Sequence, residues 1–177
     1  MNQTLVLYKS KYGASKTYAA MLKAELACPA MDLSSCPRLD SASWEHIIFV
    51  GGIYASGIPG LGLLRKKCPG LEPGKLVILC VGASPFDEKA LEELRKRCLT
   101  QGWKDVPLFY GRGAWDEDKM TWPDRILCGL LQKAVAKKNP NDLEPWMAAL
   151  LSAQGKAHDW TDAAYLEPLL ASIRHLA

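Results

Sequence analysis

The feature that most constrains the fold is a series of short, nearly continuous apolar runs. The runs cover residues 4–8, 46–52, 75–81 and 106–110. Because they do not alternate between apolar and polar residues, they are typical of strands covered on both faces. A weaker run at 30–33 ends in turn residues and predicts an edge strand.

Helical patterns separate these runs. Apolar residues recur at helical spacing after three of the predicted strands. They are Tyr18, Met21, Leu22 and Leu26 after 4–8, Leu61, Leu64 and Cys68 after 46–52, and Leu91, Leu94, Cys98 and Leu99 after 75–81. Alternating strands and helices predict an α/β fold, with a parallel sheet and right-handed crossovers. The last third predicts helices near 121–138, 143–153 and 161–176, separated at Pro140 and Pro145. We therefore expect one domain over 1–177, with an extension at about 111–160 inserted before the last helix.

Composition argues against several classes of protein. The 22 basic and 19 acidic residues give a net charge of +3 without blocks of like charge, which does not favour nucleic-acid binding. No apolar run reaches the ~20 residues of a membrane span, and no signal-peptide pattern opens the chain. The six cysteines form no C-x-x-C pair and have no histidine at ligand spacing, so we expect neither a metal site nor a redox dithiol. We interpret them as buried or half-buried thiols in a reducing cytoplasm.

The loop after the first predicted strand carries the main functional signal. Ser10, Lys11, Tyr12, Gly13, Ala14 and Ser15 lie between that strand and a predicted helix. At a helix N-terminus, free backbone amides and nearby hydroxyls can hold a phosphate. The alternative is that Ser15 is an ordinary N-cap and Gly13 a turn glycine. The nucleoside-triphosphate P-loop pattern is absent, and Arg65 replaces the third glycine of a dinucleotide-binding fingerprint that begins at Gly60.

The stretch Ser10-Lys11-Tyr12-Gly13-Ala14-Ser15 resembles the [ST]-x-x-G-x-[ST] phosphate loop of flavodoxins. It departs from that pattern at Tyr12, where flavodoxins commonly have a third small hydroxyl. The resemblance implies a flavodoxin-like three-layer fold, with a doubly wound parallel sheet in the order 2-1-3-4-5 and a helical C-terminal extension. It also implies FMN as the cofactor.

Two further loops follow the third and fourth strands, where flavodoxins grip the flavin ring. The resemblance assigns one wall of that site to Tyr54, Ala55, Ser56 and Gly57, and the other to Ala83, Ser84, Pro85 and Phe86. Aromatic side chains suit a flat ring, and glycine-rich loops bring backbone groups close to its polar edge. The alternative is that Tyr54 and Phe86 only anchor their loops and that Ser84 caps the next helix.

The C-terminal third resembles flavodoxin-type quinone-dependent protoporphyrinogen dehydrogenases at Gly111, at Asp124-Arg125 and at Thr161-Asp162. We predict an FMN-dependent redox protein with an unidentified acceptor. Such a quinone-dependent enzyme is one alternative, and a binding module without flavin is another. We assign no catalytic residue, because His46, His158 and His175 are scattered and the flavin itself would carry the chemistry.

The predicted helix at 121–138 is amphipathic and basic. Its apolar residues share one face: Trp122, Ile126, Leu127, Leu130, Leu131, Ala134 and Val135. Basic residues at Lys119, Arg125, Lys133, Lys137 and Lys138 stand against one acid, Asp124. Packing against the sheet accounts for such a pattern. The alternative is a weak contact between residues 119–138 and an anionic membrane surface.

Overall fold

A computed structural model of the chain describes residues 3–54, 57–100 and 102–176. The main sheet contains five parallel strands: β1 (Thr4–Lys9), β2 (Ala30–Asp32), β3 (His46–Gly52), β4 (Leu76–Gly82) and β5 (Leu108–Arg112). Their order is β2-β1-β3-β4-β5, which confirms the predicted order and the edge position of the second strand. Val6 is in register with Ala30 on one side and with Ile48 on the other.

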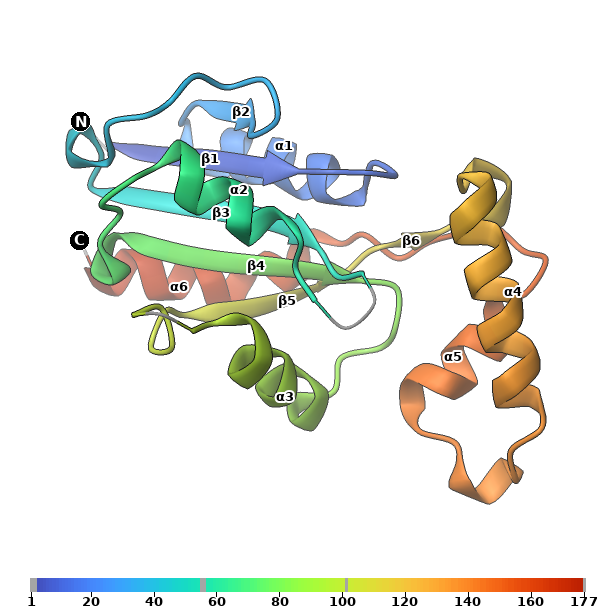
Figure 1. The fold of residues 1–177 in the computed structure, drawn as a ribbon. Helices are drawn as coiled ribbons and strands as arrows, with labels where there is room; N and C mark the ends of the chain where they lie inside the picture. The colour runs from blue at the N-terminus through green and yellow to red at the C-terminus, as the bar shows by residue number, and fades with distance from the viewer. Residues whose placement is uncertain (1–2, 55–56, 101, 177) are drawn as a thin grey trace.

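Helices cover both faces of this sheet, as Figure 1 shows. One face carries α2 (Gly60–Lys67) and α3 (Glu88–Cys98), and the other carries α1 (Ala14–Leu26) and α6 (Glu167–Leu176). Successive residues of a strand point to opposite faces. In β3, Phe49 therefore packs in the core beneath α2 and α3, whereas Ile48 and Val50 pack beneath α1 and α6.

Residues 114–159 leave the sheet as a separate projection, which we call the arm (Figure 1). A short antiparallel pair of strands, β6 (Ala114–Trp115) and β7 (His158–Asp159), forms its base. Beyond them α4 (Trp122–Ala136) packs against α5 (Pro145–Ala153) around Val135, Met147 and Leu150. The arm therefore has a small core of its own.

The placement of α4 corrects one expectation. Its apolar residues were expected to pack against the sheet, but its packing partner is α5. Trp122 is 76% exposed, Leu130 60% and Leu127 59%. The interpretation of this stripe as a face packed on the sheet is therefore wrong, although the predicted helix itself is present.

Candidate cofactor site

The carboxyl ends of β1, β3 and β4 lie at one edge of the sheet because the strands are parallel. The three loops predicted to bind the cofactor therefore meet at this edge, which is where ligands bind in open α/β sheets. The arm projects from the same edge (Figure 1).

The loop after β1 turns into α1 at Gly13, whose φ of 105° lies in the region that favours glycine. The Gly13 amide donates to Ser10 Oγ at 3.0 Å, and the Gly13 carbonyl accepts from the Thr17 amide at 2.9 Å. The amides of Ala14, Ser15 and Lys16 have no partner among the hydrogen bonds of the described residues. These amides and the positive end of the helix dipole favour an anion.

The alternative in which Ser15 caps α1 is wrong, because Gly13 is the N-cap and no side chain supplies a capping bond. Ser15 is the second residue of the helix and is only 3% exposed. Of the two serines in this loop, Ser10 is the more exposed one, and its hydroxyl accepts from the Gly13 amide. A Cβ added at Gly13 meets no atom within 4 Å, so the space beside this turn is open.

A carboxylate from the arm also contacts this loop. Lys11 Nζ lies 2.5 Å from Asp124 Oδ2, and the Tyr12 hydroxyl donates to the same oxygen. The amide of Thr121 donates to the Tyr12 hydroxyl at 3.2 Å. The hydrogen bond with Lys11 holds the pKa of Asp124 below its usual value, and the same bond raises the pKa of Lys11. The start of α4 is thus joined to the loop after β1 by a charged pair and a tyrosine.

The loop after β3 closes on itself at Tyr54 and Gly57, which exchange two backbone hydrogen bonds of 2.9 Å. Ala55 and Ser56 were also predicted to line the site, but they lie outside the described residues. The Tyr54 ring is 6.4 Å from the Tyr12 ring, and Lys11 Nζ is 5.8 Å from the centre of Tyr54. Burial raises the pKa of the half-buried Tyr54, which keeps its hydroxyl protonated. The first two loops therefore meet at a tyrosine pair.

Tyr110 of β5 contacts the loop after β4. Its hydroxyl donates to the Ser84 carbonyl and lies 3.0 Å from the Gly82 carbonyl. Phe86 packs 6.0 Å from the Tyr110 ring and is 56% exposed. The alternative in which Ser84 caps the next helix is wrong, because Asp87 accepts from the Ala90 amide at 2.8 Å and caps α3. The backbone of residues 83–85 is thus left at the edge of the sheet beside an exposed aromatic ring.

Two residues at this edge were missed in the sequence. Arg112, at the end of β5, donates from Nε to the Ala83 carbonyl at 3.1 Å. Its guanidinium carbon lies 4.0 Å from the centre of the Trp160 ring, and Trp160 stacks on His158 at 4.7 Å. A signal for Arg112 existed, because the end of β5 is at the same edge as the other loops. Trp160 lies after the arm and has no comparable signal.

The chain matches the model of the flavodoxin domain over residues 5–144, well over half of its length. It belongs to the flavodoxin domain family. Proteins of this family typically bind a flavin, and the match includes all three predicted loops of this flavodoxin domain. The finer resemblance to protoporphyrinogen dehydrogenases is not supported, and a search of curated proteins found no match.

The residues that suggested that finer resemblance have structural roles in this flavodoxin domain. A Cβ at Gly111 would lie 3.0 Å from the buried Tyr18 ring, so glycine lets this ring pack closely against β5. Arg125 donates to the carbonyls of Glu117 and Asp118 at the start of the arm. Asp162 accepts from the Ala164 amide at 2.8 Å and caps the turn that precedes α6.

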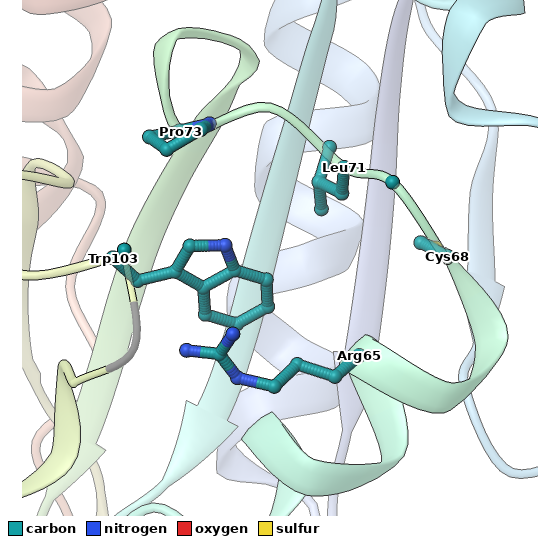
Figure 2. A pocket seen from close by; sticks show the side chains of 7 residues that line it. Arg65, Cys68, Leu71, Pro73 and Trp103 are labelled. Atoms are coloured by element: carbon teal, nitrogen blue, oxygen red, sulfur yellow. The ribbon is translucent and has the colours of Figure 1, made fainter.

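A shallow hollow of about 350 Å³ lies away from the three loops, beyond the end of α2. Arg65, Cys68, Leu71, Pro73 and Trp103 are among its lining residues, as Figure 2 shows. Helix α2 runs back from the carboxyl edge of the sheet, so its end marks the opposite edge. Arg65 covers the Trp103 ring at 3.7 Å. This hollow therefore does not belong to the candidate cofactor site.

Among the described residues, the cysteines and the potential metal ligands give no second chemical site. All six cysteines are free, and burial raises the pKa of Cys80 to about 12 and that of Cys68 to about 11. Such thiols stay protonated and are poor nucleophiles. Within the described residues, no cluster of three or more His, Cys, Asp or Glu side chains is arranged for a metal ion. In the same part of the chain, no helix combines the length and apolar character that crossing a membrane requires.

Proposed function

We propose that the chain binds one FMN noncovalently and transfers electrons or hydride equivalents between a reductant and an acceptor that is not yet identified. The observation that carries this proposal is the set of unpartnered amides at the start of α1, beside Gly13 and at the carboxyl edge of a flavodoxin sheet. When bound, FMN supplies the redox chemistry through its ring. The protein binds and orients the cofactor.

The proposed phosphate contacts come from the backbone of Ala14 and Ser15 and from the side chains of Ser10 and Lys11. The open space beside Gly13 suits a phosphate group. Asp124 brings a negative charge near this place, but its pair with Lys11 offsets that charge. The proposed ring contacts come from Tyr54 and Phe86 and from the backbone of residues 83–85, and the exposed Phe86 side chain supports this assignment.

FMN is proposed rather than FAD because the loop after β1 suits one terminal phosphate, and no second nucleotide-binding motif follows it. A cytoplasmic location fits the six free cysteines. The second candidate is a quinone-dependent dehydrogenase. It is favoured by the exposed apolar stripe of α4, which lies next to the proposed phosphate loop. The rival of another class is a module that kept the fold and lost the flavin.

The test is a titration of the purified chain with FMN, riboflavin and FAD, followed by flavin fluorescence and by thermal unfolding. We expect FMN to be quenched and to raise the melting temperature, and riboflavin to bind much more weakly because it lacks the phosphate. Ser10→Ala should weaken FMN binding, whereas the control Ser43→Ala at the opposite edge of the sheet should not. If FMN is neither quenched nor protective, the module without flavin is correct.

A further inference from the structure

The side of α4 that faces away from α5 is apolar and exposed. Trp122, Ile126 and Leu130 follow one another at intervals of four residues, and Leu127 and Leu131 form a second row beside them. All five side chains are between 41% and 76% exposed. Gln132 and Val135, on the opposite side of the helix, are buried. We call the exposed side the α4 face; at 1.5 Å per residue it is about 14 Å long.

The charge on the α4 face is positive. Lys133 and Lys137 follow Ile126 and Leu130 by seven residues each, which places them two turns further along the same side of the helix. Lys138 comes directly after them and is also exposed. Asp124 is the only acid between residues 121 and 138, and its carboxylate is engaged by Lys11 and Tyr12. An occupant of this face therefore needs apolar groups together with negative charge.

A second copy of the chain fits this requirement poorly, because its α4 face would offer these lysines no free acid: Asp124 is already engaged by Lys11 and Tyr12. A membrane with anionic lipids satisfies both needs. The headgroups neutralise lysines, and the boundary between headgroups and acyl chains accepts leucine, isoleucine and tryptophan from a helix lying in its plane. Acyl chains also adapt to a convex helix side, which a rigid protein surface does only if it has a matching groove.

We propose that the α4 face docks on the surface of an anionic lipid bilayer, with the helix parallel to the membrane plane. The helix contacts the surface and does not cross it. Trp122 then lies at the interface, the level that tryptophan prefers. The proposal does not rest on FMN binding, because every residue that carries it lies in the arm.

The test is sedimentation of the cofactor-free chain with vesicles of phosphatidylglycerol and phosphatidylcholine, compared with vesicles of phosphatidylcholine alone. We expect binding to the anionic vesicles that weakens as salt is added. Replacement of Lys133, Lys137 and Lys138 by glutamine should weaken binding by about 100-fold, from roughly fivefold for each lysine. The matched control replaces Lys89, Lys96 and Lys104 by glutamine. These lysines are exposed and lie outside the arm, so the control changes the net charge by the same amount.

A second variant tests the apolar part, with Leu127, Leu130 and Leu131 replaced by glutamine. Because these side chains are exposed, the variant should fold normally, and each leucine should contribute about tenfold to vesicle binding. Trp122 gives a direct readout: brominated lipid should quench its fluorescence, and the Trp122→Phe variant should lose that part of the quenching.

Three results would overturn the proposal. The first is an absence of binding to anionic vesicles at low salt. The second is an equal loss of binding in the α4 lysine variant and in its charge-matched control, which would indicate attraction without a docking face. The third is that wild-type protein forms a dimer in analytical ultracentrifugation and does not bind vesicles, whereas the variant with the three leucines replaced is a monomer. That outcome would make the α4 face a contact between copies.

Discussion

The conformation of Gly13 can be tested by replacing it with alanine. Its φ of 105° and ψ of −30° are unfavourable for any residue with a Cβ, and such strain costs of order 1–3 kcal/mol. A Cβ here meets no atom within 4 Å, so no steric clash adds to the cost. Alanine also restricts the unfolded chain, which offsets about 0.4–1 kcal/mol. The net expectation for Gly13→Ala is a loss of about 1–2 kcal/mol.

For a chain of this length, that loss corresponds to a decrease in melting temperature of about 2–8 °C. The matched control is Gly62→Ala. Gly62 is an exposed residue within α2 and also has no atom within 4 Å of an added Cβ, but its φ is not positive. The same chemical change should therefore stabilise the chain by roughly 0.5–1 kcal/mol at this position.

Both variants are measured by thermal unfolding followed by circular dichroism, without cofactor. Opposite signs are expected for the two glycines. If Gly13→Ala is as stable as wild type while Gly62→Ala gains stability, the turn at Gly13 does not have the described conformation. A third variant, Gly13→Val, should abolish FMN quenching because its side chain would occupy the space assigned to the phosphate, and its unfolding curve separates that effect from misfolding.

Two further predictions concern the contacts around the site. Tyr110→Phe removes the hydroxyl that contacts the Gly82 and Ser84 carbonyls, so it should lower the free energy of unfolding by about 1–3 kcal/mol and weaken FMN binding. Urea unfolding measures the first effect and an FMN titration the second. If the titration is unchanged, the loop after β4 is not part of the FMN site. Asp124→Asn should loosen the start of α4 and speed limited proteolysis of residues 116–121 at pH 7. In the folded chain the pKa of Asp124 is lowered and that of Lys11 is raised. The difference in proteolysis rate between Asp124→Asn and wild type should therefore disappear as pH falls through the lowered pKa of Asp124, and also as pH rises through the raised pKa of Lys11. If the two rates still differ at both extremes of pH, the ion pair is not the cause.

The sheet can be predicted from sequence because each strand carries its own signal. Ile47, Ile48, Phe49 and Val50 are apolar in succession, and both faces of β3 are indeed buried. The stretch from Ser10 to Ser15 could be singled out for a similar reason, since its residues are contiguous and follow the first strand. Helix α1 begins directly after Gly13 because glycine allows the turn that starts the helix there.

The contacts of the arm could not be predicted in this way. Asp124 is 113 residues from Lys11, and no local pattern reports a side-chain pair at that separation. The apolar spacing of α4 is also the same whether its partner is a sheet, another helix or a lipid layer. Periodicity shows which side of a helix is apolar, but it does not identify what covers that side.

Asp124 connects the two proposals of function, because it lies in the first turn of α4 and also bonds to the phosphate loop. A phosphate that attracts Lys11 would weaken the bond between Lys11 and Asp124, and so would change how the arm is held. Linkage then requires that FMN alter the affinity for vesicles by the same factor by which vesicles alter the affinity for FMN. Measuring both affinities with the other ligand present and absent tests this equality. In Asp124→Asn, the factor for vesicle affinity and the factor for FMN affinity should both approach one. If the factor is already one in wild type, the position of the arm does not depend on the cofactor.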